Sequence, residues 1–329
     1  MEKYQHLSLA CRVELKVLRD QGASIRGAAR ALGRSASSIS RELKRHCLNS
    51  PYDAGIAQRN SLMRRRRGGR KLKPKTALWD LMVKQLQDAW SPEQIAQRLR
   101  LLHPGKPGER VSDTTIYRAI YALPKGELKK DLLSCLRQAG RARRPGSGGK
   151  KRSEVLKNIT PIQARPAEVE ARLIPGHWEA DLIKGAGNQS AVATMVERVS
   201  RFTIMAELPD AKATSVLEAL TKALGTQPAS MLRTLTYDRG TEMARHEELA
   251  ARLNIQVYFC DPHSPWQRGA NENMNGLIRQ YLPKGTDLSV NGQAYLNDIA
   301  YALNTRPRKA LGFKTPLEKY TELLATHAG

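Results

Sequence analysis

Three acidic residues in the second half of the chain lie where carboxylates can do chemistry. Asp181 lies in GHWEADLIKG, a mixed apolar and acidic stretch that has the pattern of a strand. Asp238 follows an apolar run at residues 232–237 and is expected at the turn that ends a buried strand. Glu272 lies in the first turn of a helix-compatible segment, residues 270–281. Carboxylates are hard oxygen ligands that suit Mg²⁺ or Mn²⁺, so these three are candidate metal ligands.

The inference of a metal site depends on where these acids lie in the predicted elements, because aspartate and glutamate also have ordinary structural roles. An acid at the carboxyl end of a strand, before a helix, is a common place for site chemistry in α/β sheets. A glutamate in the first turn of a helix is also an ordinary partner for the helix dipole. The 33 residues between Asp238 and Glu272 do not decide between the two interpretations.

The segments around the three acids resemble the acidic motifs of DDE transposases. They read HWEADLI, TYDRGTE and PWQRGANENMNGLIRQYLPKG, and they are most similar to the bacterial insertion-sequence-thirty group. The third segment, with its Pro-Trp-Gln-Arg-Gly turn, is the most specific. The resemblance extends from the N-terminal helices to NTRPRKALGFKTPLE, so it covers nearly the whole chain. Ala180 and Ala270 depart from the residues that are usual in the family, but neither replaces a ligand.

This resemblance implies a metal-dependent transposase with an integrase-like catalytic core. Asp181, Asp238 and Glu272 would be its catalytic residues and its ligands for Mg²⁺ or Mn²⁺. Two ions would be bound, with Asp181 between them, Asp238 on one and Glu272 on the other, so that one activates the nucleophile and one supports the leaving oxygen. Such an enzyme would bind the terminal inverted repeats of an insertion sequence, cleave DNA strands and transfer them to target DNA.

Other side chains near the acids are candidates for DNA contacts or for supporting roles. Glu179 shares a strand face with Asp181 but is expected at the surface, and Trp266 is expected to pack the turn before the helix. His177 and His263 each have a structural interpretation beside one in contact with DNA. Groups suited to the DNA backbone lie on or near the helix of the third acid: Arg268, Asn271, Asn275, Arg279 and Lys284.

The elements that must position the acids follow from the patterns after residue 171. The expected strands are 176–185, 191–199, 201–208, 232–237 and 256–260. Three strands come first, and helices then alternate with the later strands, which indicates a mixed sheet in an α/β domain. We therefore expect a ribonuclease H-like domain at residues 171–329. Its basic loop RPRKALGFK is a DNA contact or simply surface.

The charge of the chain points to nucleic acid as the partner. The formal net charge is +24, and residues 1–152 carry +23 of it, with 35 Lys and Arg against 12 Asp and Glu. Phosphate neutralisation by such a basic region supplies most non-specific affinity for DNA. An anionic membrane surface is the weaker alternative, because no strongly amphipathic anchor helix is evident.

Residues 1–50 have the pattern of a helix-turn-helix DNA-binding domain. Ser8 is expected to cap the first helix, in which Leu9, Val13, Val17 and Leu18 form the apolar face. The exposed face of the third helix offers side chains to bases or phosphates: Ser37, Ser38, Arg41, Lys44 and Arg45. A structural three-helix bundle with a solvated charged face is the alternative.

Residues 76–138 repeat this organisation as a second helix-turn-helix-like domain. Its candidate DNA-binding residues are Thr114, Thr115 and Arg118, and Tyr117 is expected in its core. Basic linkers are predicted on either side, at residues 51–75 and 139–170. The whole is a multidomain protein with all-α helix-turn-helix units followed by an α/β catalytic domain.

Several classes of protein are disfavoured by what the sequence lacks. No run of 18 apolar residues and no signal-peptide pattern is present, so a cytoplasmic, nucleoid-associated bacterial protein is expected. Four scattered cysteines disfavour disulfides and a zinc site, and the absence of a P-loop disfavours a nucleotide cofactor. Pairing of two element ends predicts a homo-oligomer, at least a dimer, on double-stranded DNA. The competing hypothesis is a sequence-specific repressor whose ribonuclease H-like domain is not catalytic.

Overall fold

A computed structural model describes residues 6–46, 51–65, 72–136, 156, 158–262 and 264–327. The chain divides into two compact units, Met1–Lys71 and Leu72–Gly329. Most of the second predicted linker, at 139–155, lies outside the described residues, as does His263. Within the described ranges, no helix is both long enough and apolar enough to cross a membrane.

The first unit is a small helical bundle, as its capping residues and spacing predict. Its helices are α1 (Leu9–Asp20), α2 (Ile25–Ala31), α3 (Ala36–His46) and α4 (Ala54–Arg65). Ser8 and Ser24 cap the first two helices by accepting hydrogen bonds from backbone N–H groups three residues later. Leu15, Ala28 and Ile39 are fully buried where the helices meet.

The predicted apolar face of α1 is right only at Leu18, which packs against the core. Leu9, Val13 and Val17 are each 48% exposed. The buried residues of the helix are Leu15 and Arg12. The guanidinium of Arg12 donates through Nε to Glu42 Oε1 at 2.7 Å. The spacing of apolar residues indicates a helix, but it cannot predict that a charged residue is buried in an ion pair.

Part of the first predicted linker is also helical. Helix α4 lies within the range predicted as a basic linker, residues 51–75, and Ala54 and Ala57 at its start are buried in the same core as α1. The bundle therefore extends at least to the end of α4.

A second set of helices opens the larger unit. It comprises α5 (Ala77–Gln87), α6 (Pro92–Leu102), α7 (Asp113–Tyr121) and α8 (Glu127–Ser134). Ser91 starts α6 with a capping box, in which the Gln94 N–H donates to Ser91 Oγ at 3.2 Å and Gln94 Oε1 accepts from the Ser91 N–H at 2.8 Å. Ile95 and Ile116 are fully buried between α6 and α7. Tyr117, expected in this core, is instead 39% exposed.

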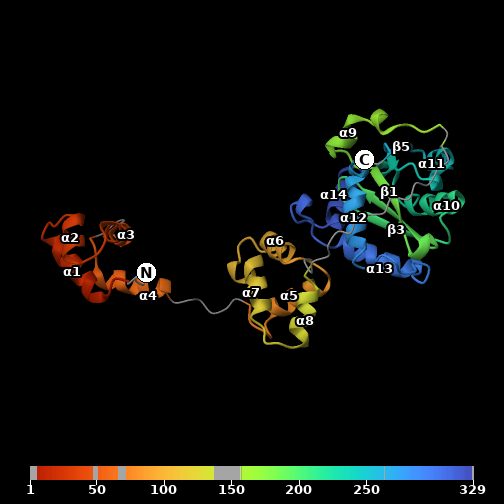
Figure 1. Ribbon diagram of the computed structural model, residues 1–329. Coiled ribbons are helices and arrows are strands. Elements are labelled where there is room, and N and C mark those ends of the chain that lie inside the picture. Colours follow the sequence, from red (N-terminus) through yellow and green to blue (C-terminus); the bar gives the residue numbers. More distant parts are fainter. Residues whose placement is uncertain are drawn as a thin grey trace. The chain divides into compact units, whose positions relative to one another are not determined.

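The rest of the larger unit is built on a mixed sheet, which confirms the predicted α/β class. Its strands are β1 (His177–Lys184), β2 (Ala191–Glu197), β3 (Thr203–Leu208), β4 (Thr234–Tyr237) and β5 (Gln256–Phe259). Their order in the described sheet is β3-β2-β1-β4-β5. The first three strands are antiparallel neighbours, and β4 and β5 run parallel to β1 (Figure 1). The strand that bears Asp181 is therefore central.

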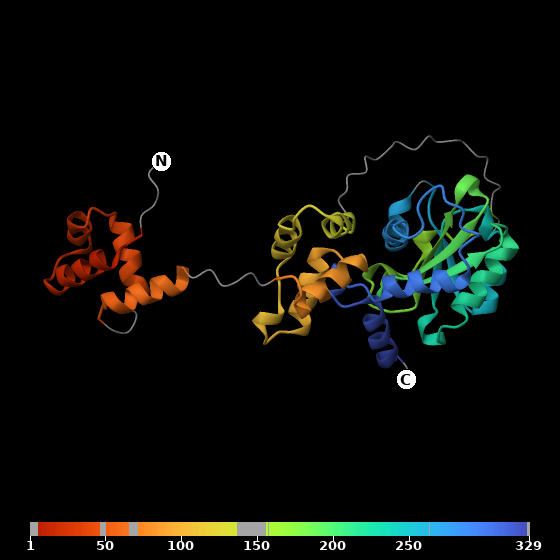
Figure 2. The same cartoon turned by 90° about the horizontal axis from the view of Figure 1, so that it is seen from below.

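Helices cover both faces of this sheet. They are α10 (Ala213–Leu224), α11 (His246–Leu253), α12 (Gly269–Ile278), α13 (Gln293–Asn304) and α14 (Pro316–His327). Trp178, Ala180 and Leu182 of β1 belong to the core that includes residues of α10, α11 and α14, whereas Ile183 belongs to the core under α12 and α13 (Figures 1 and 2). Because side chains alternate along a strand, Asp181 points to the α12 side.

Two regions expected as linker or loop belong to this core. The short helix α9 (Ala167–Ala171) falls in the range predicted as the second linker, yet its Val169 is fully buried. In the basic loop near the end of the chain, Arg306 is fully buried and Arg308 nearly so. Arg308 donates to the Leu303 carbonyl at 2.9 Å, so this part of the loop supports the fold rather than a free basic surface.

Candidate active site

Strands β1 and β4 bring Asp181 and Asp238 to the same end of the sheet. The parallel ladder pairs His177 with Thr234 and ends at Glu179 opposite Thr236. Two residues further on, each strand reaches one of the acids. Asp238 accepts a hydrogen bond from Gly240 N at 3.2 Å, which fixes the turn after β4.

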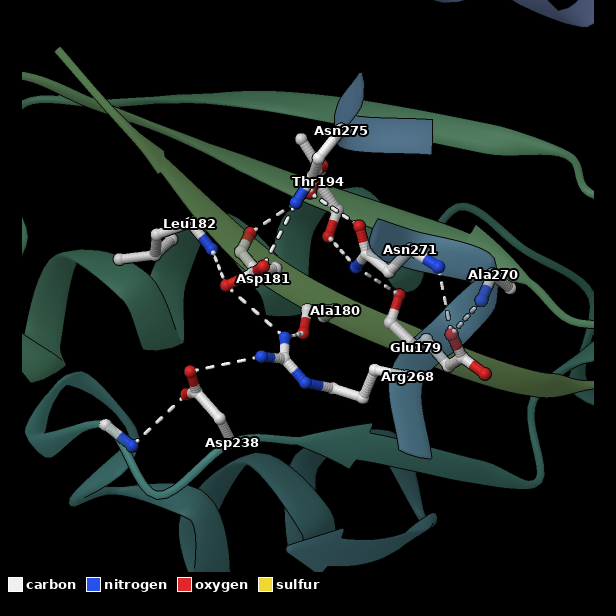
Figure 3. Close-up of polar contacts among 11 residues, drawn as sticks. Glu179, Ala180, Asp181, Leu182, Thr194, Asp238, Arg268, Ala270, Asn271 and Asn275 are labelled. Atoms are coloured by element: carbon white, nitrogen blue, oxygen red, sulfur yellow. Dashed lines mark hydrogen bonds and ion pairs between the residues drawn. The ribbon is translucent and has the colours of Figure 1, made fainter. Parts of the chain in front are cut away.

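The guanidinium of Arg268 lies between the two carboxylates (Figure 3). Its Nη1 is 3.3 Å from Asp181 Oδ1, and its Nη2 donates to Asp238 Oδ2 at 3.1 Å. Nη1 also donates to the Ala180 carbonyl at 2.9 Å. Arg268 ends the short 3₁₀ helix Pro265–Arg268 that leads into α12, so a third chain segment meets the two strands here.

Two asparagines of α12 contact the strands beside Asp181, and one of them holds its carboxylate. Asn275 Nδ2 donates to Asp181 Oδ2 at 3.0 Å, and the N–H of Leu182 donates to Oδ1 at 2.9 Å. Asn271, one turn earlier, donates to the Glu179 carbonyl at 3.0 Å. The Thr194 hydroxyl on β2 lies 3.0 Å from Asn275 Oδ1 and 3.1 Å from Asn271 Oδ1, and it links both amides to the sheet (Figure 3).

Glu179 is fully buried, and its predicted place at the surface is wrong. Its Oε2 accepts hydrogen bonds from the backbone N–H groups of Ala270 and Asn271 at 3.0 and 2.9 Å, and its Oε1 pairs with Arg198. It therefore satisfies free donors at the N-terminus of α12 and interacts favourably with the helix dipole. The spacing Glu179-x-Asp181 did show that both acids share one face of β1.

Glu272 is not in contact with the other two acids in this conformation. It lies in the first turn of α12 with an exposed side chain. Among the described residues, no group of three His, Cys, Asp or Glu side chains is close enough together to hold a metal ion. The structure thus joins Asp181 and Asp238 and leaves Glu272 at solvent, one helical turn after Arg268.

Some of the remaining predicted site residues are exposed, and others are buried or hydrogen-bonded within the fold. On α3 and α7, Ser37, Arg41, Lys44, Arg45, Thr114 and Arg118 are exposed, and Ser38 and Thr115 are half-buried. Lys284 is exposed, whereas Arg279 is half-buried and donates to the Lys184 carbonyl at 2.9 Å. Asn271 is fully buried, which leaves none of its side chain exposed for the predicted contact with DNA.

Two aromatic residues near the site also differ in their surroundings. Trp266, expected to pack the turn, is 71% exposed. His177 is buried, its Nδ1 lies 2.9 Å from Thr234 Oγ1, and it has the structural place that was one of its two interpretations.

The electrostatics at the two aspartates are those of a site built for a cation. Burial raises the pKa of Asp181, the charge of Asp238 raises it further, and Arg268 opposes both. Burial also works against the charged form of Arg268, but the two carboxylates outweigh it and raise the pKa of the guanidinium. The positive charge of Arg268 thus stabilises the ionised form of Asp181, which burial and the charge of Asp238 disfavour.

Comparisons with known proteins identify the family of the chain. The chain matches the family model described as integrase core domain at residues 173–265, and that described as helix-turn-helix domain at residues 3–46. It is 48% identical over 326 residues to the transposase for insertion sequence element IS1086 of Cupriavidus metallidurans, covering 98% of this chain and 96% of that protein. It is 41% identical over 317 residues to the transposase InsI for insertion sequence element IS30A of Escherichia coli, covering 95% and 82%.

The chain belongs to the family of insertion-sequence transposases. The family, the enzyme class and the two-part architecture predicted from the motifs are thereby confirmed. Membership also favours the enzyme over the non-catalytic repressor. Among solved structures, the catalytic core domain of BIV integrase is similar over 46% of this chain and 98% of that one, but its TM-score of 0.37 at 21% identity is too low to support an argument.

Proposed function

We propose that this transposase cleaves and joins DNA strands at Asp181, Asp238 and Glu272, with divalent ions held by these carboxylates. The observation that carries the proposal is the convergence of Asp181 and Asp238 on one cationic group, Arg268. Two carboxylates drawn from neighbouring parallel strands and aimed at a single positive charge have the ligand type that Mg²⁺ and Mn²⁺ require.

The two carboxylates suit such ions, since the positively charged guanidinium of Arg268 already lies between them, where an ion would bind. Ions bound there would supply charge neutralisation at the scissile phosphate and activation of an oxygen nucleophile. The protein's own part is positioning: Asn275 and the Leu182 N–H hold the Asp181 carboxylate, and the Gly240 N–H holds that of Asp238. A ligand fixed in this way loses little freedom when it binds an ion.

Glu272 would complete the set from α12. Its backbone is fixed because the helix start is held by Glu179 and the following turns by Asn271 and Asn275. Residues three apart in an α-helix lie on the same side, so Glu272 shares a face of α12 with Asn275, whose side chain contacts Asp181. Rotation of an exposed side chain, rather than movement of the helix, would bring it to the ions.

DNA would be recognised mainly by the helical units. The exposed serine and basic side chains of α3 suit a recognition helix in the major groove of the terminal repeats, and those of α7 suit a second contact. Lys284 and Arg279 would neutralise phosphates near the catalytic acids. We infer that at least two copies act together on DNA, because two element ends must be brought to one target.

The test is strand transfer by Asp238→Asn, using purified protein, element-end DNA and Mg²⁺ or Mn²⁺. Loss of one ligand carboxylate is expected to reduce joining by at least about a hundredfold. Binding of end DNA, measured by fluorescence anisotropy, should stay within about twofold, since recognition lies elsewhere.

A matched control is Asp298→Asn, which removes the same charge from an exposed position on α13. It should join DNA as the wild type does. Unchanged joining by Asp238→Asn would refute the catalytic assignment.

A further inference from the structure

Arg268 occupies the place where a cation would be expected, and it does so with several bonds at once. It contacts Asp181, Asp238 and the Ala180 carbonyl, and its side chain is only 12% exposed (Figure 3). Its guanidinium carbon also lies 6.0 Å from the centre of the Tyr237 ring, at the outer limit of the distance for a cation–π contact.

The carboxylate oxygens available to an incoming ion are those that Arg268 uses. Asp181 Oδ2 is taken by Asn275, and Oδ1 is shared between the Leu182 N–H and Arg268. On Asp238, Oδ1 accepts from Gly240 and Oδ2 from Arg268. A divalent ion that binds both aspartates must therefore compete with the guanidinium for Asp181 Oδ1 and Asp238 Oδ2.

We propose that Arg268 is an internal counter-cation that divalent metal ions must displace, and that bound DNA takes the released guanidinium on a backbone phosphate. This rests on the proposed function, because it takes Asp181 and Asp238 as metal ligands. Without DNA the arginine keeps the two carboxylates neutralised and weakens metal binding. With DNA present, a phosphodiester gives the guanidinium another anionic partner that it can bind in bidentate fashion.

The location of Arg268 allows this exchange. It is the last residue of the 3₁₀ helix Pro265–Arg268, immediately before α12, and Trp266 in the same short helix is 71% exposed. The start of α12 is held by hydrogen bonds that the backbone N–H groups of Ala270 and Asn271, beyond Arg268, donate to Glu179 Oε2. The arginine side chain can thus leave the aspartates while the helix that bears Glu272 keeps its place.

The proposal makes metal and DNA binding mutually dependent. Each ligand favours the state in which Arg268 has left the aspartates, so each raises the affinity for the other by the same factor. Removal of the arginine should remove both the competition and the coupling. The expected signature is a variant that binds metal more tightly than the wild type when no DNA is present.

The experiment is Mn²⁺ titration of the full chain by isothermal calorimetry, with and without a short element-end duplex. Arg268→Ala is expected to bind Mn²⁺ about tenfold more tightly than the wild type without DNA, because two charge-assisted contacts no longer compete. DNA should tighten Mn²⁺ binding by the wild type by about the same factor and should change that of Arg268→Ala little.

Arg239→Ala is the matched control. It removes the same charge next to Asp238, but Arg239 pairs with Asp261 at 3.6 Å and donates to the Cys260 carbonyl rather than to the catalytic aspartates. Its effect on Mn²⁺ affinity should be clearly smaller. Arg268→Lys serves as a second variant should the alanine change disturb folding, since one ammonium cannot hold both carboxylates as the guanidinium fork does.

The outcomes separate this proposal from the one it rests on. If Asp181→Asn and Asp238→Asn abolish Mn²⁺ binding but folded Arg268→Ala and Arg268→Lys bind Mn²⁺ no more tightly than the wild type, Arg268 is not a competing cation and the metal site stands. If the aspartate variants bind Mn²⁺ as the wild type does, the metal site itself is refuted. Tighter binding by both arginine variants, lost on adding Asp181→Asn, supports both proposals.

Discussion

His177 shows how the interior of the α/β core sets the charge of a single side chain. Burial, and then the charges of Arg233, Arg198 and Arg165, lower its pKa from 6.5 to about 4. Glu168 lies 3.7 Å from Nε2 and would favour a charged ring, but that carboxylate is 42% exposed and screened by solvent. The folded protein therefore favours the neutral form of the His177 imidazole.

This residue predicts an acid limit to stability. The unfolded chain binds a proton on this histidine below pH 6.5, whereas the native state does so only near pH 4. Stability is therefore complete above about 6.5 and declines as the pH falls toward 4, by up to about 3 kcal/mol. Urea unfolding of the wild type and His177→Asn between pH 7 and 4.5 measures this contribution. The variant should lose less stability on acidification, and two parallel curves would contradict the assignment.

The acids on β1 perform two different tasks that their residue type does not distinguish. The partners of Asp181 leave it able to bind a cation. In Glu179, one carboxylate oxygen accepts from the N-terminus of α12 and the other pairs with Arg198. The fully buried carboxylate of Glu179 thus fixes the helix that carries Glu272, whereas the carboxylate of Asp181 is partly exposed. At the scale of the element, β1 and α12 are one unit joined by polar contacts.

Glu179→Gln tests that coupling between strand and helix. An amide keeps the shape but cannot neutralise the buried Arg198, so the free energy of unfolding should fall by about 3 kcal/mol. Chemical denaturation measures it directly. Glu218→Gln is the matched control: that side chain is 65% exposed and its ion pair with Arg252 lies on the surface, so the change should stay within about 0.5 kcal/mol.

Helix α1 offers a similar contrast within the N-terminal bundle. Arg12→Ala leaves Glu42 buried without its ion-pair partner and should destabilise the bundle by about 3 kcal/mol. Val17→Ser alters a position that is 48% exposed and should change stability by less than about 0.5 kcal/mol. Thermal unfolding of the two variants measures both effects. A larger loss from Val17→Ser would restore the apolar face expected from the sequence.

These elements also show what the sequence could predict and what it could not. The order of strands and helices from β1 to α12 followed from local pattern and turn residues, since each strand is short, apolar and bounded by a turn. The burial of Arg12 and Glu179 could not be predicted in that way, because each depends on a partner 30 or 19 residues away, Glu42 or Arg198. For the same reason, the motifs indicated the acids, but the placement of Arg268 between Asp181 and Asp238 required the fold.

At the scale of the molecule, positive charge is divided among three regions. Residues 1–71 carry a formal charge of +12, residues 72–152 carry +11, and residues 153–329 carry +1. The catalytic sheet thus lies in the nearly neutral region, and both helical sets that precede it are basic. With this division, the basic helical regions can supply the affinity for DNA. The region that contains the acidic site adds almost no net charge.

The division predicts what a chain lacking residues 1–71 would do. Residues 72–329 form a compact unit with its own cores and should remain folded, with Mn²⁺ binding at Asp181 and Asp238 retained. Half of the excess positive charge is removed with the first unit, so the slope of log affinity for DNA against log salt should fall by roughly half. Discrimination of element-end DNA from random DNA should also fall, by about a thousandfold if α3 is the main reader. Fluorescence anisotropy over a salt series measures both quantities, and undiminished discrimination by the shortened chain would assign recognition to α7 instead.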